Sequence, residues 1–450
     1  MQFELTKQFL EDISNAIASK NATVVIDLVE DLHPVDIAEI LDSVSSEEAQ
    51  FIYRQLDTKI SSTVLVELEE DVREKFLASL SAKEIAVQLE SIDSDDAVDI
   101  IQDLPDYRKQ RVISQLEDLE LAEDIAELLI YDEDVAGGLM AKEYIVTNIN
   151  WTVEQSLFKL REQAEDTNYV YTIYVVDDEN KLLGTLSLKS FLYAKNTTKI
   201  VDLYRKEPIS VSVTTSDEEV AQIMDKYDLV AIPVVDKDNF LLGRITIDDI
   251  VDVMREEAEK DFQMASGISE RIDDKDSVFV LSRARLPWLL IGLFGGIMGS
   301  LVIGSFDEQL KVLPVLAFFI PLIGAMGGNV GVQSSAIIVQ GLANNSLSVN
   351  STYKKVIKEL GVALINGSVL GLLIFAYTYF TVNDPRLSFT IATSLLVVII
   401  FAGIFGTLIP LILHKRNIDP ALATGPFITT INDIIGQLIY FTIAGYFFFY

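Results

Sequence analysis

The sequence predicts a multidomain membrane protein with an all-α superhelical N domain, α/β tandem domains, a connecting helix and an all-α domain of five transmembrane helices. Three observations lead to this fold class: a charge difference between the two halves of the chain, an internal repeat and five long apolar stretches. Residues 1–280 contain 62 acidic and 26 basic residues, whereas residues 281–450 contain six acidic and nine basic ones. An acidic, soluble half is therefore joined to an apolar half with little net charge.

This composition excludes several classes of protein. A single soluble domain does not contain an apolar half of this length. Non-specific nucleic-acid binding needs a basic surface, whereas the formal net charge here is −33. The chain has no cysteine, which excludes a disulfide scaffold, a thiol nucleophile and cysteine-ligated zinc.

Residues 1–136 are expected to form short amphipathic helices. The segment 32–38 (LHPVDIA) resembles 80–86 (LSAKEIA), and 45–49 (SSEEA) resembles 93–97 (DSDDA). A proline at the first helical position, or a serine or aspartate cap, followed by acidic and spaced apolar residues is typical of a helix start. Because these starts recur, we expect a helical superhelix, with His33 in a turn.

Residues 137–256 contain an internal repeat with an offset of 59 residues. The segment 174–184 (YVVDDENKLLG) recurs as 233–243 (PVVDKDNFLLG), and each copy predicts strand, turn, strand, helix. The repeat resembles a tandem pair of CBS domains (the cystathionine-β-synthase type), at 137–200 and 201–256. Such domains commonly sense adenine nucleotides through a Thr-x-x-Asp motif that contacts ribose. Thr246 and Asp249 match that motif in the second copy, so the resemblance implies an ATP site there and not in the first copy.

Acidic residues are concentrated at helical spacing in the first half. The pairs three or four residues apart include Asp95 with Asp99, Asp249 with Asp252, Asp252 with Glu256, and Glu257 with Asp261. Like charges about 4 Å apart repel by roughly 4 kcal/mol at an effective dielectric constant of about 20. Such faces either stay apart in water or close around a cation, and an ordinary solvated acidic helix is the alternative for each cluster.

Five stretches of the second half are long and apolar enough to span a bilayer, which takes about 20 residues. They are 287–306, 313–341, 359–381, 388–413 and 424–449. We expect prolines and glycines to interrupt the second stretch, and Gly425 with Pro426 to interrupt the fifth. Seven Lys and Arg residues lie in the connections on one side and two on the other, which places residues 1–280 in the cytoplasm and the C-terminus outside. No apolar stretch opens the chain, so no cleavable signal peptide is expected.

Asp433 is the acid that lies deep in a predicted span, about nine residues into the fifth. A carboxylate at this depth is costly, so a functional role is the first hypothesis, and a hydrogen-bonded structural role is the alternative. The second span carries the polar segment 327–333 (GGNVGVQ), where glycines permit either a broken helix that lines a watery path or close helix packing. Carbonyl, amide and carboxylate oxygens together suit Mg²⁺.

Taken together, the sequence resembles the MgtE family of magnesium channels over essentially its whole length. The matching segments are 134–140 (DVAGGLM), Gly328-Asn329-x-Gly331-x-Gln333, and 419–422 (DPAL) followed by Pro426, Thr430, Asp433 and Gly436. The resemblance implies a homodimer. An enzyme is not expected, because the sequence shows no nucleophile–base pair or carboxylate pair at a useful spacing. The parts of the chain would be an acidic helical N domain (1–136), the CBS pair, a plug helix (257–282) and a pore domain (283–450).

The resemblance also implies where Mg²⁺ binds. Asp433 matches the pore acid, with Asn329 nearby. The cytoplasmic acids of the family match Asp95, Asp99, Glu218, Asp228, Asp249, Asp252, Glu257 and Asp261. Lys260 stands where the family often has an acid, and Val332 where it often has an asparagine.

The function implied is Mg²⁺ influx through a channel that closes when cytosolic Mg²⁺ binds the acidic interfaces of the N, CBS and plug regions. Two other functions fit the same residues. One is a secondary transporter for divalent cations in which Asp433 exchanges a proton. The other is a membrane-anchored nucleotide sensor without transport.

Overall fold

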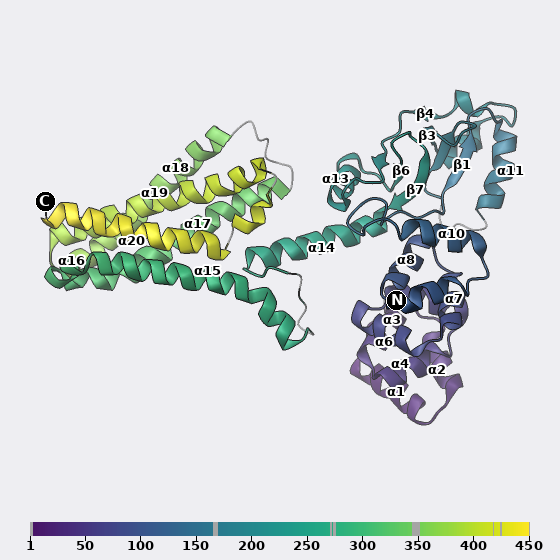
Figure 1. Ribbon diagram of the computed structural model, residues 1–450, viewed down its shortest axis with the longest axis horizontal. Helices are drawn as coiled ribbons and strands as arrows, with labels where there is room; N and C mark the ends of the chain where they lie inside the picture. The colour runs from purple at the N-terminus through teal and green to yellow at the C-terminus, as the bar shows by residue number, and fades with distance from the viewer. Residues whose placement is uncertain are drawn as a thin grey trace. The chain divides into compact units, whose positions relative to one another are not determined.

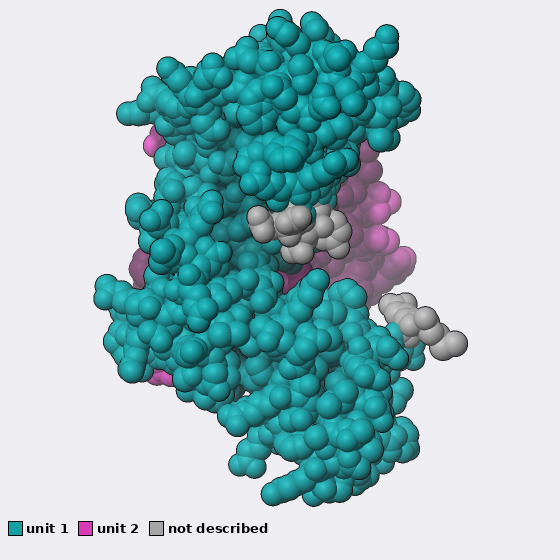
Figure 2. All heavy atoms as spheres, turned by 90° about the vertical axis from the view of Figure 1, so that its right-hand side faces the viewer, with its two compact units in different colours: residues 1–254 teal, residues 255–450 magenta. Residues whose placement is uncertain are grey.

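The computed structural model describes residues 3–164, 170–270, 272, 276–343, 352–416, 418–423 and 425–449. The chain divides into two units, residues 1–254 and 255–450, which Figure 2 shows in different colours. We describe each unit by itself, with the labels of Figure 1.

Within the described residues 3–136, the chain forms ten short helices, which confirms the expected all-α N-terminal region. They are α1 (Lys7–Ala18), α2 (Ala22–Val29), α3 (Pro34–Ser43), α4 (Ser46–Tyr53), α5 (Thr58–Glu67), α6 (Glu70–Ser79), α7 (Ala82–Leu89), α8 (Ser94–Gln102), α9 (Asp106–Ile113) and α10 (Leu119–Leu128).

The helix starts lie where the sequence predicts them. Ser45 and Ser81 each accept a hydrogen bond from the backbone three residues on, and a glutamate returns the bond, which completes two capping boxes. Pro34 opens α3, where a missing N–H costs nothing. His33 is the residue before it, and its Nδ1 accepts from the Val35 amide at 3.4 Å. These local interactions fix the start of each helix.

The repeated helix starts correspond to a structural repeat. The pair α3–α4 and the pair α7–α8 have matching buried positions, so that Ile37 and Ile85, and likewise Ala49 and Ala97, lie in the same core. Several helices contact the next but one along the chain: α3 contacts α5, α5 contacts α7 and α7 contacts α9. This pattern is a superhelix, because each layer covers the apolar face of the one before.

The tandem repeat folds as two α/β modules with the expected order of strand, turn, strand and helix. The first contains β1 (Ile145–Asn148), α11 (Val153–Gln163), β2 (Ile173–Val176), β3 (Leu182–Leu186), α12 (Leu188–Tyr193), a 3₁₀ turn η1 (Ile200–Asp202) and β4 (Arg205–Lys206). The second contains β5 (Val211–Ser212), α13 (Asp217–Tyr227), β6 (Ala231–Val235), β7 (Leu241–Thr246) and α14 (Ile247–Ala265). The two sheets have the orders β1-β2-β3-β4 and β5-β6-β7. The first pair of strands is parallel in each sheet, and the next is antiparallel.

The two hairpin turns are equivalent and hold the modules together. Asn180 and Asn239 both have φ of 67°, a left-handed conformation that asparagine tolerates. The backbone N–H of Leu182 donates to the Asn239 carbonyl at 2.9 Å, and that of Leu241 donates to the Asn180 carbonyl at 3.1 Å. The repeat in the sequence is therefore a pseudo-twofold in the structure.

The connecting helix is α14, and its bounds differ from the expected 257–282. It continues from the second repeat without a break, because no proline or glycine lies between Thr246 and Ala265 to end it. It ends before Gly267, whose φ of 82° is the left-handed conformation typical of a residue after a helix. The last residues of the expected range begin the next helix, which Ser277 caps.

Five helices of the described residues are long and apolar enough to cross a membrane, as predicted. They are α15 (Val278–Ser305), α17 (Ile320–Ala343), which follows the 3₁₀ turn η2 (Pro314–Phe319), α18 (Thr352–Thr381), α19 (Pro385–Lys415) and α20 (Gly425–Phe449). A short helix α16 (Asp307–Val312) precedes η2, and a turn η4 (Pro420–Ala423) precedes α20. Helix α19 contacts α17, α18 and α20, and the helices run alongside one another in Figure 1.

The expected interruptions of the second span by glycines and of the fifth by Gly425 with Pro426 are wrong, whereas the prolines of the second span do mark a change from the 3₁₀ turn η2 to helix α17. Helix α17 is continuous through the glycine segment, and Gly425 with Pro426 begins α20 instead of breaking it. Pro314 and Pro321 likewise lie in the first turn of an element, where proline is tolerated. The glycines serve close packing: the Gly331 Cα faces the Asn432 side chain, and a Cβ on Gly406 would overlap the Gly331 carbonyl.

Replacing Gly331 with Val is expected to lower the thermal midpoint of the detergent-purified protein by several degrees. The added carbons would overlap Asn432 and Ile428 of α20, and overpacking of this kind costs about 1–3 kcal/mol. Gly296→Val is the matched control, because a Cβ there has no atom within 4 Å. Equal midpoints for the two variants, measured by tryptophan fluorescence on heating, would contradict this packing role.

Candidate cation sites

A cavity of about 310 Å³ lies between α17 and α20, at membrane depth. Its polar lining residues are Asn329 of α17 and Thr429, Asp433 and Gln437 of α20. Asp433 is eight residues from the start of α20, which is about 12 Å along the helix at 1.5 Å per residue. The structure therefore brings Asn329 and Asp433 to one cavity, as the sequence predicts.

Glycines of α17 make room for the Asp433 carboxylate. A Cβ on Gly324 would lie 3.2 Å from Asp433 Oδ1, and a Cβ on Gly328 would lie 3.9 Å from it. Because these two glycines are one turn apart, α17 presents to α20 a face without side chains at this level. The carboxylate is half-buried against backbone, with the cavity in front of it.

The chemistry of this cavity suits a hydrated divalent cation. Carboxylate, amide and hydroxyl oxygens line it, and Mg²⁺ usually keeps several waters and takes one or two carboxylates. Gln437 Oε1 is buried and has no hydrogen-bond partner among the described residues, so it is available to a water or ion. Val332 is not a lining residue, so its departure from the family pattern does not change this wall directly.

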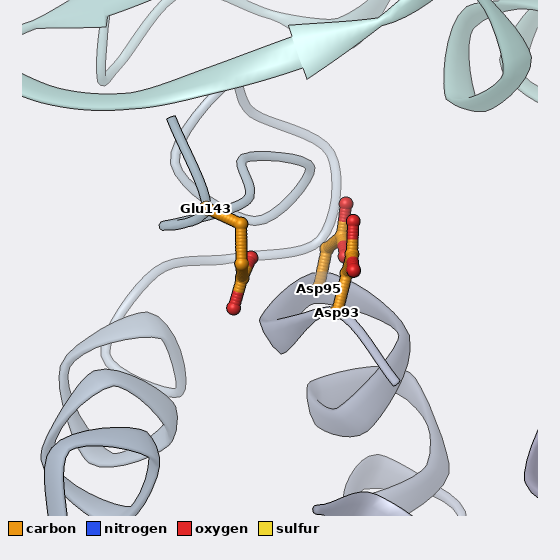
Figure 3. A group of neighbouring side chains, drawn as sticks. All are labelled: Asp93, Asp95 and Glu143. Carbon is orange, nitrogen blue, oxygen red and sulfur yellow. The ribbon is translucent and has the colours of Figure 1, made fainter. Parts of the chain in front are cut away.

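A second candidate site lies within residues 1–254, at the beginning of α8. Asp93, Asp95 and Glu143 each place a carboxylate oxygen within 4.8 Å of the other two. Among the described residues, these three form the one group of three or more side chains close enough to hold a metal ion together. Figure 3 shows Asp93 and Asp95 at the start of α8 and Glu143 on the segment before β1. The group therefore combines side chains from the N-terminal helices and from the segment that leads into the first repeat.

Hydrogen bonds hold this group in place. The Ser94 amide and hydroxyl donate to the two Glu143 carboxylate oxygens at 3.1 and 2.9 Å, which places a carboxylate at a helix N-terminus. Asp93 makes no capping hydrogen bond and accepts instead from Arg244 Nη2 at 3.2 Å. The Arg244 Nε also donates to the Glu143 carbonyl oxygen. Lys142, the residue before Glu143, pairs with Glu127 at 2.8 Å, so its charge is directed to that glutamate.

Burial and charge repulsion raise the pKa values of the carboxyl groups in and next to this group. Burial, with the nearby charge of Asp249, raises the pKa of Asp95 well above its ordinary value. The same two causes raise the pKa of Asp96 to about 7, and burial raises that of Asp249 to about 6. Burial also raises the pKa of Glu143. Arg244 pairs with Asp93, and the raised pKa values show that the ionised forms of Asp95 and Glu143 are disfavoured, so binding a proton or a metal ion would relieve their charge.

Stability of the soluble unit should therefore depend on pH when divalent cations are absent. Carboxyls with raised pKa values take up protons on folding between about pH 4 and pH 7, so the free energy of unfolding falls as pH rises through that range. We expect the melting temperature of residues 1–265 to be on the order of 5 °C lower at pH 8 than at pH 5.5. Calorimetry in EDTA measures this difference, and a higher melting temperature at pH 8 would contradict it.

The remaining predicted cytoplasmic ligands lie apart from this group or at its edge. Asp249 raises the pKa of Asp95, as does Asp96, which is not among the predicted ligands. Asp99, one turn along α8, has surface exposed to solvent, but burial of its carboxyl group raises its pKa to about 7. Asp228 is exposed at the end of α13, with φ of 52°, a conformation that aspartate tolerates at a helix end. Glu218, on the first turn of α13, and Asp252 of α14 are also exposed.

Two predicted ligands lie on the part of α14 that belongs to residues 255–450. Glu257 pairs with Lys260 at 2.8 Å, so the lysine that departs from the family pattern supplies a counterion to this carboxylate. Asp261 is half-buried one turn further on. The structure does not join these two acids into a cluster of three metal-ligating groups among the residues it describes.

The predicted nucleotide residues interact with each other. Asp249 Oδ2 accepts from the Thr246 amide at 3.0 Å and from its hydroxyl at 2.9 Å. The Thr246 hydroxyl also donates to Asp248. This arrangement begins α14, and it orients the Thr-x-x-Asp motif at the end of β7.

Sequence reasoning missed Asp93 and Glu143. Asp93 has the pattern of an ordinary helix cap, and Glu143 is a single acid 50 residues further on. Only the Leu139–Met140 segment of the family motif, shortly before Glu143, could have directed attention to it. The fold brings the two together because the N-terminal helices contact the segment before β1.

Comparison with known proteins agrees with this organisation. Residues 32–134 match the model of the MgtE intracellular N domain, 134–196 and 200–256 match the CBS domain, and 320–443 match MgtE, described as a divalent cation transporter. The chain is 31% identical to the magnesium transporter MgtE of Bacillus subtilis, over 93% of this chain and 92% of that one. It is 30% identical to the magnesium transporter MgtE of Thermus thermophilus, over 96% and 97%.

A solved structure shares the fold of the first half. It is the cytosolic domain of the Mg²⁺ channel MgtE in complex with ATP, 31% identical, which aligns with a TM-score of 0.51. The alignment covers 54% of this chain and 99% of that one.

Proposed function

The chain belongs to the MgtE family of magnesium transporters, which are membrane proteins and not enzymes, and from this we propose that it is a Mg²⁺ channel gated by cytosolic Mg²⁺. The observation that carries the proposal is the cavity between α17 and α20, where Asp433 faces a glycine surface at membrane depth. A carboxylate in this position attracts a cation that keeps its water shell.

Mg²⁺ would enter down its electrochemical gradient. The N-terminal domain is cytosolic, and five spans then place the C-terminus outside, in agreement with the seven basic residues on the cytosolic side. The inside-negative potential contributes about 2.3 kcal/mol per elementary charge per 100 mV, twice that for a divalent ion. This force needs no coupled proton.

Gating would depend on the carboxylates at the beginning of α8. At high cytosolic Mg²⁺, an ion bound by Asp95 and Glu143, with Asp249 nearby, would replace the missing positive charge and hold the N-terminal helices against the first repeat. At low Mg²⁺, repulsion would favour the open state, because a ligand shifts an equilibrium by its difference in affinity. The boundary between the two units falls within helix α14, which would carry the change. The further ligands proposed are Asp99, Glu218, Asp228, Asp252, Glu257 and Asp261.

We also propose that the channel is a homodimer. Both repeats expose large apolar side chains on their helices, among them Phe158 of α11 at 76%, Leu192 of α12 at 81% and Tyr227 of α13 at 49%. Burial of these side chains against a second copy of the chain would remove their apolar surface from water. The proposed parts are the N domain 1–136, the CBS pair 137–200 and 201–256, the plug 257–282 and the pore domain 283–450.

ATP is the proposed nucleotide of the CBS pair. The related cytosolic domain binds it, and Thr246 and Asp249 are oriented here at the end of β7. Calorimetric titration of residues 1–265 with ATP, with Asp249→Ala as the comparison, tests this assignment. A variant that binds ATP as tightly as the parent would remove these two residues from the site.

Reconstituted flux tests the main proposal. Vesicles containing the protein should take up Mg²⁺ in response to an inside-negative potential, and a pH gradient at zero potential should have no effect. Competition with Mn²⁺ and Co²⁺ in the same vesicles ranks the three ions. Uptake that follows the pH gradient would favour the proton-coupled transporter, and tight ATP binding without any flux would favour the nucleotide sensor.

A further inference from the structure

An apolar cavity of about 530 Å³ lies at the cytosolic end of the membrane unit. Its walls come from the end of α14 and the segment after it, the third and fourth turns of α15, the last turns of α19, the connection that follows α19 and the beginning of α20. Met264, Trp288, Leu413 and Phe427 are among its lining residues. It shares no lining residue with the cavity of Asp433, and its volume lies in the range of about 300–1,000 Å³ typical of ligand sites.

The lining excludes a cation or a nucleotide as the occupant. Among the lining residues, Ser269 is the one with a hydroxyl, and that hydroxyl donates to the Ala284 carbonyl at 2.8 Å. The Trp288 indole supplies the other polar group, and the remaining side chains are aliphatic, aromatic or thioether groups. Such a surface gains free energy only by covering apolar atoms.

The cavity opens at its edge through side chains that are themselves apolar. Ile412 is 46% exposed, Ile418 42%, Leu422 37% and Ile291 38%. Ile412 lies near the end of its span, Ile418 and Leu422 in the connection after it, and Ile291 within the span formed by α15. Their exposed surfaces therefore extend from the acyl-chain region to the boundary with the headgroups. A membrane lipid can therefore reach the cavity without crossing water.

Three basic residues lie about one helical turn from lining residues of the cavity. Arg285 precedes Trp288 by one turn of α15, and Lys415 and Arg416 come three residues after Ile412 and Leu413 of α19. All three basic residues are exposed, and none of them forms an ion pair with a described residue. Arg283, by contrast, is already paired with Glu270 at 2.7 Å. A positive rim around an apolar cavity on the cytosolic side matches an anionic headgroup above an acyl chain.

We propose that this cavity binds an acyl chain of an anionic phospholipid of the cytosolic leaflet, with its headgroup on Arg285, Lys415 and Arg416. The lipid would touch both the end of α14 and the spans that form the bundle, since both line the cavity. The site is thus a specific lipid site in addition to the cation sites.

Tryptophan quenching tests this proposal directly. The chain has two tryptophans, so Trp151→Phe in the full-length protein leaves Trp288 as the reporter in the cavity. Phosphatidylglycerol with brominated chains, added in small mole fractions to phosphatidylcholine nanodiscs, is expected to quench Trp288 in a saturable manner. Replacing Arg285, Lys415 and Arg416 with Gln should raise the half-quenching mole fraction roughly tenfold.

Two controls separate a specific site from ordinary boundary lipid. Lys354→Gln with Lys358→Gln removes exposed basic residues of α18, which contributes no lining residue, and should leave the quenching curve unchanged. Ile412→Phe, which fills the opening, should reduce the quenching at saturation. Equal, non-saturating quenching by brominated phosphatidylcholine would overturn the proposal, and so would the absence of quenching by either lipid. None of these readouts depends on Mg²⁺ transport.

Discussion

Asp433→Asn is expected to lower Mg²⁺ flux by at least about 100-fold. A carboxylate attracts a divalent ion about 4 Å away by roughly 8 kcal/mol at an effective dielectric constant of about 20. Loss of even a third of this attraction corresponds to about two powers of ten in occupancy. Asparagine has the same shape, so contact with the glycine face of α17 is preserved and the effect reports charge. Uptake into vesicles with a fluorescent Mg²⁺ indicator measures the rate.

The control for this variant is Asp307→Asn. Asp307 is an exposed acid of the same unit that pairs with Lys311, and it lies outside the cavity. Its loss should leave flux within about twofold of the parent, because exposed ion pairs contribute little. Near-normal flux in Asp433→Asn would remove this carboxylate from the ion path.

The second large effect is expected from Asp95→Asn combined with Glu143→Gln. These changes keep the shape of the group at the beginning of α8 but remove two of its charges. The cytosolic Mg²⁺ concentration that half-closes the channel should rise by about tenfold or more, because the cation loses two carboxylate ligands. Patch recordings with Mg²⁺ varied on the cytosolic side give this concentration.

Protein stability distinguishes this loss of sensing from simple damage. Without Mg²⁺, the neutral variant should melt at a higher temperature than the parent, because the buried repulsion is gone. With Mg²⁺, its gain in melting temperature should be smaller than that of the parent. The control is Glu11→Gln with Glu154→Gln, which removes the same charge from exposed positions of α1 and α11. This control should change neither the melting temperature without Mg²⁺ nor its gain with Mg²⁺. Unaltered inhibition by Mg²⁺ in the double variant would refute the sensing role.

Much of the fold could be predicted because its signals are local. Capping residues such as Ser45 and Ser81 act on amides three residues away, and a turn such as that at Asn180 is set by its own side chains. The five spans could be predicted from length and hydropathy alone. The glycines of α17 could not be interpreted in this way, because a broken helix and close packing require the same residue. The contact of Gly331 with Asn432 decides for packing.

The candidate sites likewise differ in whether local sequence or tertiary contacts define them. The sequence by itself determined that Asp433 is the deep carboxylate, since its depth follows from its place in one span, and that the net negative charge is confined to the first half. Only the tertiary structure decided that Glu143 joins Asp93 and Asp95, and that segments of α14, α15, α19 and α20 line one apolar cavity. The physical reason is that hydropathy and capping act within a few residues, whereas charge repulsion, desolvation and cavity shape depend on which distant segments the fold brings into contact.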